Sequence, residues 1–228
     1  MANIRRRNLR GSKQLRIIPS RFPPITLFER LVDADELEVA YAIESMTNDR
    51  VQAELGNLYL VDKADWVTGP GASIVMAAFT HIGRKSRFSD GSYGVYYAGR
   101  DEQTAIVETV FHTERRMRET KEPAIELEMR CYAGTIREPL DDIRGNTYAH
   151  FRDPDLSTWV VCQAFGAERR AADAFGILYR SARNPGGECI ASFTPKAVSR
   201  PKQGKHFRYC WNGTRIDRVI DIRGIRLL

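Results

Sequence analysis

Three polar side chains in successive elements of the chain could meet in one site. Arg87 lies in a polar loop over residues 83–94, Tyr97 in an expected strand over residues 95–98, and Glu108 near the start of a helix expected over residues 101–118. Spacings of ten and eleven residues therefore join a loop, a strand and a helix start, and such elements can converge on one cleft. Ser181 ends a further expected strand, over residues 176–181.

These residue types favour binding of an anion and stabilisation of positive charge. Arginine suits a diphosphate because its planar fork donates two hydrogen bonds at once, and a carboxylate such as Glu108 stabilises positive charge that develops beside it. Each residue also has a simpler interpretation. A helical Glu or a loop Arg is usually a solvated surface charge, and Ser181 could cap the turn before Asn184. Tyr96 and Tyr97 point to opposite faces of their strand, so one belongs to the core and the other to the cleft.

Several common enzyme motifs are absent from the sequence. It has no Gly-x-x-x-x-Gly-Lys-[Ser/Thr] loop, no Gly-x-Gly-x-x-Gly after a strand and no Gly-x-Ser-x-Gly elbow, which excludes the usual P-loop, Rossmann and hydrolase patterns. The four histidines form no His-x-x-x-His pair. Glu108 and His112 are four residues apart on one helix and could donate two ligands, but no third ligand accompanies them, so we expect no metal.

Positive charge is concentrated at the start of the chain. The net charge is +6, and residues 1–21 carry seven basic residues and no acid, while the other 207 residues hold the remaining 28 of 35 basic residues and all 29 acidic ones. We therefore interpret residues 1–21 as a basic arm and predict a solvated, frayed terminus. The alternative function is nucleic-acid binding by this arm, with Phe22, Phe28 and Trp66 as stacking partners. The neutral body argues against it, because nucleic-acid-binding domains usually spread their charge over a face.

The order of expected elements predicts an α+β fold. Helices are expected over residues 33–46, 72–80, 101–118 and 156–175, and strands over 57–61, 95–98, 124–132, 176–181, 189–193, 206–211 and 215–222, with 22–28 extended. Strands and helices mix without strict βαβ alternation. Residues 22–228 are predicted to form a single domain. Four widely spaced cysteines predict reduced thiols and a cytoplasmic protein, and we expect neither a secretory signal nor a membrane span.

The chemistry-bearing residues resemble the RES-domain family, which is named for an arginine, a glutamate and a serine. The resemblance rests on Arg87 in the loop, Tyr97-Ala98 in the strand, Ala105-x-x-Glu108 in the helix and Ser181 at a later strand end, and it is best over residues 70–200. The pair Arg16-Ile17 resembles the part of the family's first strand that carries an arginine. Arg21 is the alternative candidate for that arginine. The loop Lys85-Ser86-Arg87-Phe88-Ser89 departs from the family's Gly-Gly-Arg-Trp-Asn, because both the glycines and the Trp-Asn are replaced.

The resemblance implies a fold related to ADP-ribosyltransferases, with a mixed sheet and flanking helices. It also implies a toxin that consumes NAD⁺ by cleaving the nicotinamide–ribose bond, without a metal. Cleavage builds positive charge on the ribose. Glu108, Arg87 and Ser181 are the catalytic candidates, and Arg16, Arg87, Tyr97 and Ser181 the NAD⁺-binding candidates.

The resemblance also bears on acceptors and partners. The acceptor of ADP-ribose could be water, phosphate or a protein, and we favour a protein. The implied partner is an Xre-type helix-turn-helix antitoxin, and a homodimer or a toxin–antitoxin hetero-oligomer is compatible with the sequence. No direct binding of nucleic acid or membrane is expected from this interpretation. A third interpretation is an interaction module without activity of its own.

Overall fold

The computed structural model describes residues 4–22, 25–31, 33–47 and 56–222. Within them lies a nine-stranded sheet in the order β1-β5-β6-β7-β3-β2-β4-β8-β9, in which β5 and β6 are parallel and the other neighbours antiparallel. The predicted α+β class with a mixed sheet is confirmed. The strands are β1 (Arg6–Arg7), β2 (Lys13–Pro19), β3 (Tyr96–Gly99), β4 (Ile125–Thr135), β5 (Leu140–Asp142), β6 (Gly176–Arg180), β7 (Glu188–Ser192), β8 (Lys202–Trp211) and β9 (Ile216–Ile222).

The described residues also form five α-helices, and α5 shows how a capping residue sets where a helix begins. The helices are α1 (Thr26–Arg30), α2 (Ala34–Thr47), α4 (Ala72–Thr80), α5 (Glu102–Glu119) and α6 (Trp159–Ala171), with short 3₁₀ turns between them. At the start of α5, the Asp101 side chain accepts a hydrogen bond from the Thr104 N–H at 2.8 Å. Arg116 and Arg118 lie in its last turn, where positive charge complements the helix dipole.

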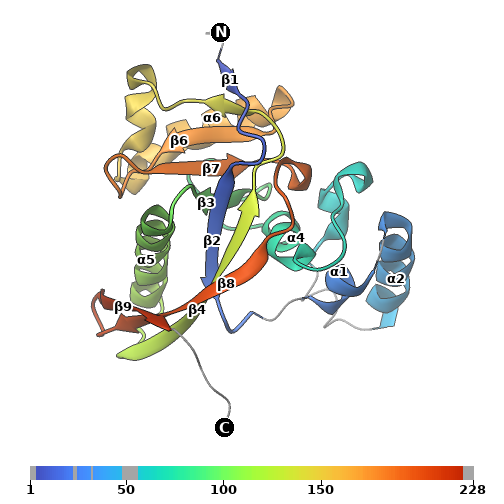
Figure 1. The fold of residues 1–228 in the computed structure, drawn as a ribbon, viewed down its shortest axis with the longest axis horizontal. Helices are drawn as coiled ribbons and strands as arrows, with labels where there is room; N and C mark the ends of the chain where they lie inside the picture. The colour runs from blue at the N-terminus through green and yellow to red at the C-terminus, as the bar shows by residue number, and fades with distance from the viewer. Residues whose placement is uncertain (1–3, 23–24, 32, 48–55, 223–228) are drawn as a thin grey trace.

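The sheet carries helices on both faces. Helices α1, α2 and α4 lie to one side of the central strands and α5 to the other (Figure 1). The core on the α4 side includes Val75, Met76 and Tyr96. On the opposite face, α5 covers a cluster that includes Leu15 and Ile17, and α6 covers a second one that includes Tyr179. The sheet face shared by α5 and α6 is the one that receives Tyr97.

Strand β2 corrects the interpretation of the basic arm. A solvated, frayed terminus is wrong for residues 13–19, because β2 pairs with β4 over seven residues and with β3 at Leu15 and Gly99. Leu15 and Ile17 are buried, an alternation that the surrounding basic residues conceal in the sequence. Arg6 and Arg7 also join the sheet, through β5.

Two further expectations are wrong. Residues 57–61 form a 3₁₀ turn (Leu58–Leu60) rather than a strand, because the Asn57 side chain accepts the Tyr59 N–H and folds the backbone into a turn. The extended segment over 22–28 gives way to α1 from Thr26, since proline restricts the residue before it and not those after it. Part of this segment, residues 23–24, lies outside the described residues.

The other predicted helices and strands are present, with shifts of a few residues at their ends, while strand β5 was not predicted. The predicted helix over 156–175 is divided into a 3₁₀ turn (Leu156–Thr158) and α6. All four cysteines are free thiols, as predicted, and all four are buried. None of the described helices combines the length and apolar character needed to cross a bilayer. Among the described residues, no three His, Cys, Asp or Glu side chains gather as a metal site would require.

Candidate active site

Glu108 and Ser181 meet directly, although 73 residues separate them in the sequence. Glu108 lies in the second turn of α5 and Ser181 directly after β6. The Ser181 hydroxyl donates to Glu108 Oε1 at 2.6 Å and accepts the backbone N–H groups of Arg183 and Asn184 at 3.0 and 2.9 Å. Two donors thus occupy the serine oxygen and direct its proton to the carboxylate. Ser181 therefore caps the turn before Asn184, as its simpler interpretation predicts, and it also contacts Glu108.

Arg183 is a member of this group that the sequence reasoning missed. Its Nη1 lies 3.3 Å from Glu108 Oε2, and the side chains of Arg183 and Glu108 are only 10% and 19% exposed. The guanidinium stacks on the Phe111 ring, 3.4 Å from the centroid. Burial lowers the pKa of Arg183, and the charge of Glu108 opposes that shift. The sequence offered one indication of this role, because Arg183 lies two residues after Ser181, in the turn that brings the chain back to α5.

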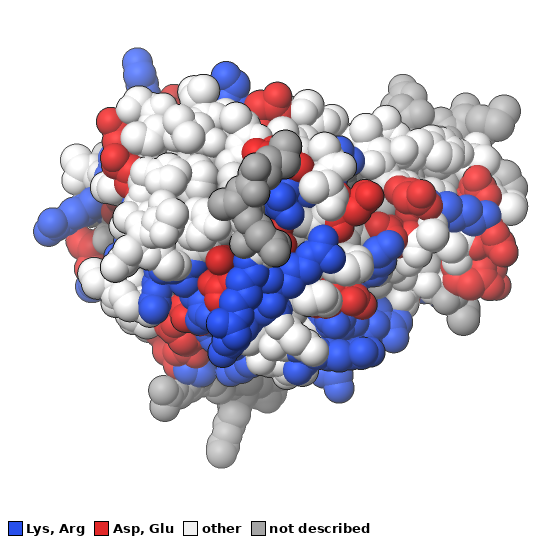
Figure 2. Space-filling model, turned by 90° about the horizontal axis from the view of Figure 1, so that it is seen from above, with Lys and Arg blue, Asp and Glu red and all other residues white. Residues whose placement is uncertain are grey.

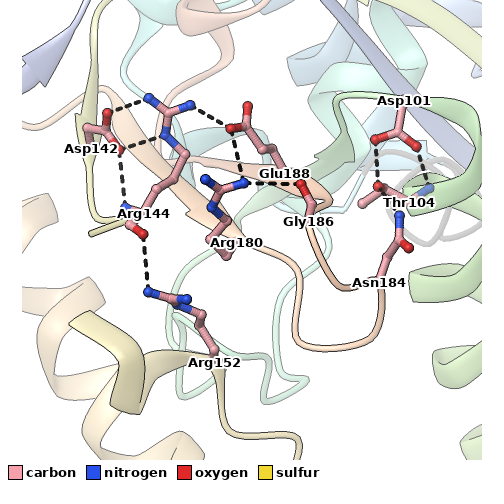
Figure 3. Close-up of polar contacts among 9 residues, drawn as sticks. All are labelled: Asp101, Thr104, Asp142, Arg144, Arg152, Arg180, Asn184, Gly186 and Glu188. Atoms are coloured by element: carbon pink, nitrogen blue, oxygen red, sulfur yellow. Dashed lines mark hydrogen bonds and ion pairs between the residues drawn. The ribbon is translucent and has the colours of Figure 1, made fainter. Parts of the chain in front are cut away.

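The loop that carries Ser181 and Arg183 is anchored at both ends (Figure 3). On one side, Asn184 donates to the Thr104 hydroxyl at 2.8 Å, and Thr104 donates in turn to Asp101, the cap of α5. The close approach of the loop to α5 requires glycine at 187, since a Cβ there would lie 2.4 Å from Thr104 Oγ1.

An ion-pair network holds the other end of the loop (Figure 3). Arg180 donates to the Gly186 carbonyl at 3.1 Å and lies 3.7 Å from the carboxylate of Glu188. Arg144 joins Glu188 to Asp142, at 2.6 Å to each. The loop is therefore built into the sheet and α5 rather than exposed as a free turn.

Arg87 is buried at the wall of the same region. It is 6% exposed, and its Nη1 donates to the carbonyls of Phe151 and Asp153 at 2.7 and 3.2 Å. Its guanidinium also lies 5.9 Å from the ring of Trp159. Arg87 thus fixes the loop that carries it, while its Nη2 is buried without a partner among the described residues.

Tyr97 points to the face covered by α5 and α6, and its hydroxyl orders the Arg87 loop. The oxygen accepts the Phe88 N–H at 2.9 Å and lies 2.9 Å from Ser86 Oγ. Burial raises the pKa of Tyr97 well above its ordinary value. Tyr97 is therefore a neutral hydrogen-bonding group. It can organise the wall of the site, and its hydroxyl stays protonated at neutral pH.

An aromatic contact joins these segments, because the ring of Phe88, next to Arg87, lies 5.0 Å from the ring of Tyr179, two residues before Ser181. The pKa of buried Tyr179 is raised, first by burial and then by charges that include Glu108, while Arg87 opposes the shift. Burial likewise raises the pKa of Cys189, with the same opposed contributions from Glu108 and Arg87. The structure therefore brings Arg87, Tyr97, Glu108 and Ser181 into one region.

Arg16 lies elsewhere. It belongs to β2, whereas its rival Arg21 follows the strand, exposed beside Phe22. Since Leu15 and Ile17 face α5, the Arg16 side chain leaves the other face of the sheet. There it lies over the Tyr96 ring at 4.5 Å and donates to the Tyr97 carbonyl at 3.0 Å. The described contacts of Arg16 join β2 to β3 and do not include Glu108 or Ser181.

His112 follows Glu108 by one turn of α5. Its ring lies against Phe111 and Trp159, at 5.3 and 6.1 Å between centroids, and keeps an exposed edge. Enclosure by neighbouring side chains, followed by the charges of Arg183 and Arg115, lowers the pKa of His112 to about 4. His112 is therefore a neutral imidazole at ordinary pH and does not compensate the charge of Glu108.

A cavity of about 550 Å³ lies apart from this group. Glu29 in its wall already caps α4, accepting the N–H groups of Gly71 and Ser73 at 2.7 and 2.9 Å. Its basic lining residues Arg137, Arg200 and Lys202 are exposed. We therefore identify the candidate site by the converging buried polar groups rather than by cavity volume.

The chain belongs to the RES-domain family, whose pattern matches residues 57–212. The match includes Arg87, Tyr97, Glu108 and Ser181, while Arg16 lies outside it. An uncharacterized protein, y4oC, of Sinorhizobium fredii (strain NBRC 101917 / NGR234) is 34% identical over 206 residues, which cover 88% of this chain and 84% of that protein. The solved M. tuberculosis MbcT–MbcA toxin–antitoxin complex is similar at 15% identity and a TM-score of 0.36, over 60% of this chain and 71% of that chain.

Proposed function

We propose that this protein cleaves the nicotinamide–ribose bond of NAD⁺ and transfers the ADP-ribose to an acceptor. The observation that carries the proposal is the contact of Ser181 with Glu108, two of the residues on which the resemblance to the family's arginine, glutamate and serine rests. A carboxylate held in a partly buried position, with one oxygen fixed by a hydroxyl and the other by an arginine, suits the stabilisation of positive charge on a ribose.

The surrounding groups support an anionic nucleotide as substrate. Arg87 and Arg183 both hold buried N–H groups without partners among the described residues, which favours binding of phosphate oxygens. Tyr97 is neutral and lies at the wall beside Arg87, where it could hold a ribose hydroxyl or the nicotinamide. Glu108 would act by electrostatics, so the reaction needs no covalent protein nucleophile.

The proposal includes a biological role. The enzyme would be the toxin of a toxin–antitoxin pair in the cytoplasm, neutralised by an Xre-type antitoxin, and its four free thiols suit that compartment. We favour a protein as the acceptor of ADP-ribose, with water and phosphate as the other two acceptors.

The test is nicotinamide release from NAD⁺ by the purified, antitoxin-free chain, beside the Glu108→Gln variant. Release that the substitution removes supports the cleavage chemistry. The assay is run in buffer alone, with inorganic phosphate, and with cell lysate. Free ADP-ribose as the only product in the presence of lysate would refute the protein acceptor. Folded wild-type protein that releases no nicotinamide under all three conditions would refute the proposed reaction.

A further inference from the structure

The guanidinium of Arg183 has one edge engaged and one edge free. Its Nη1 lies on Glu108 Oε2 at 3.3 Å. Its Nε and Nη2 are buried and have no hydrogen-bond partner among the described residues. Buried donors of a charged group are costly when unsatisfied, so their presence next to a candidate catalytic carboxylate points to a ligand.

The two free nitrogens form a geometric unit. The N–H bonds of Nε and Nη2 run parallel along one side of the guanidinium plane, and this edge matches the two oxygens of a phosphate or carboxylate. The third nitrogen, Nη1, points to the Glu108 side. One side chain can therefore bind an oxyanion and the carboxylate at the same time.

The free edge is held in place before any ligand arrives. The guanidinium stacks on Phe111 at 3.4 Å, and the loop is tied to α5 through Asn184 and Thr104. Arg87 adds a second buried cation nearby, since the charges of both Glu108 and Arg87 act on the Arg183 guanidinium. Arg183 pairs with Glu108, whereas Arg87 donates only to backbone carbonyls, so the charge of Arg87 is one that an anionic ligand would balance.

We propose that Arg183 binds a phosphate of the substrate's diphosphate through its Nε–Nη2 edge, while Nη1 remains on Glu108. This inference rests on the proposed cleavage of NAD⁺. It adds Arg183 to Arg16 and Arg87, the arginines that the sequence suggested for the diphosphate, and it links phosphate binding to the position of the carboxylate.

The test compares two donors that share the scissile bond and differ in phosphate. NAD⁺ has a diphosphate, and nicotinamide riboside has no phosphate. The variants are Arg183→Gln and Arg183→Lys, with Arg118→Gln as the matched control. Arg118 lies on α5 ten residues after Glu108 and pairs with Glu114. Circular dichroism and thermal melting establish that each variant is folded.

Arg183→Gln is expected to lower kcat/KM for NAD⁺ about ten- to 150-fold more than for nicotinamide riboside, the effect of one charged hydrogen-bonded contact. Arg183→Lys keeps the charge but not the paired edge, so it should resemble Arg183→Gln, and Arg118→Gln should resemble wild type. Equal losses on the two donors would mean that Arg183 acts only by positioning Glu108, and would overturn the proposal.

A binding measurement separates this inference from the proposed reaction. If wild type releases no nicotinamide from either donor, the proposed reaction fails. Calorimetric titration with ADP-ribose then still tests whether Arg183 binds phosphate. Weaker binding by Arg183→Gln than by wild type and Arg118→Gln supports the phosphate contact. Equal binding by all three, or no binding by wild type, overturns it.

Discussion

Substitution of Ser181 by alanine tests the site at its central contact. The serine hydroxyl makes three hydrogen bonds, one to Glu108 and two to the backbone of the following turn. A hydrogen bond to a charged group contributes about 1.5–3 kcal/mol. If the contact orients the carboxylate in the transition state, Ser181→Ala should lower kcat/KM for nicotinamide release about ten- to 150-fold, since about 1.4 kcal/mol corresponds to a factor of ten.

The loop itself should survive this substitution. The Ser181 N–H still donates to the Gly187 carbonyl at 2.9 Å, and the Gly187 N–H to the Asn184 carbonyl at 2.8 Å. Two neutral turn hydrogen bonds are lost, at about 0.5–1.5 kcal/mol each. For a chain of this length, 1 kcal/mol shifts Tm by about 2–4 °C. We therefore expect a lower Tm but a folded enzyme at the assay temperature.

Asn184→Ala is the matched control. It removes the side-chain bond to Thr104 but keeps the Asn184 backbone N–H and the contact of Ser181 with Glu108. It should lower Tm with a smaller effect on kcat/KM than Ser181→Ala has. The reasoning is refuted if folded Ser181→Ala keeps wild-type kcat/KM. Equal losses of activity in the two variants would also refute it, because Ser181 would then act through the order of its loop.

The remaining predictions concern the carboxylate, the loop, a histidine and the basic segment. Glu108→Gln should lower nicotinamide release about 10²–10³-fold, while Glu119→Gln, an exposed residue of the same helix, should retain activity in the same assay. Gly187→Ala should lower Tm and kcat/KM, because its Cβ would lie 2.4 Å from Thr104 Oγ1, whereas Gly145→Ala meets nothing within 4 Å and should melt like wild type. The pKa of His112 is about 4 in the folded chain and about 6.5 when unfolded. As the pH falls, the unfolded chain therefore binds the proton before the folded chain does, so the stability of the fold should fall between pH 6.5 and 4. Thermal melts across that range should show a less steep fall for His112→Gln than for wild type. Replacing the exposed residues Arg5, Arg7 and Arg10 by Gln should leave nicotinamide release unchanged, and a loss of activity in the folded variant would contradict this.

Local signals predicted most of the elements that position the site. Asp101 caps α5 as its residue type and place suggest, and α4 covers the predicted residues 72–80. Asp33 likewise accepts the Glu36 N–H at 2.8 Å at the start of α2. These elements were predictable because caps and apolar spacing act within a few residues of the chain.

The features that local sequence patterns did not predict depend on distant partners. Strand β2 lies in a stretch of the chain that is rich in basic residues, and it exists because β4 and β3 supply its hydrogen bonds. The alternation of Leu15 and Ile17 was the signal for it, and the same alternation places Arg16 on the opposite face from the Tyr97 ring. The role of Arg183 was hidden for a related reason, since its contact with Glu108 exists only after the loop folds back on α5.

The position of β2 also changes how the basic segment can be tested. The N-terminal end of the molecule shows a band of Lys and Arg with Asp and Glu among them (Figure 2). Deleting residues 1–15 to remove this charge would also remove β1 and the first three residues of β2, including Leu15, which is buried under α5. Such a deletion would unfold the sheet beside the candidate site and lose activity whatever the charge does. Only substitutions that preserve β2 can distinguish nucleic-acid binding by the basic segment from its structural role.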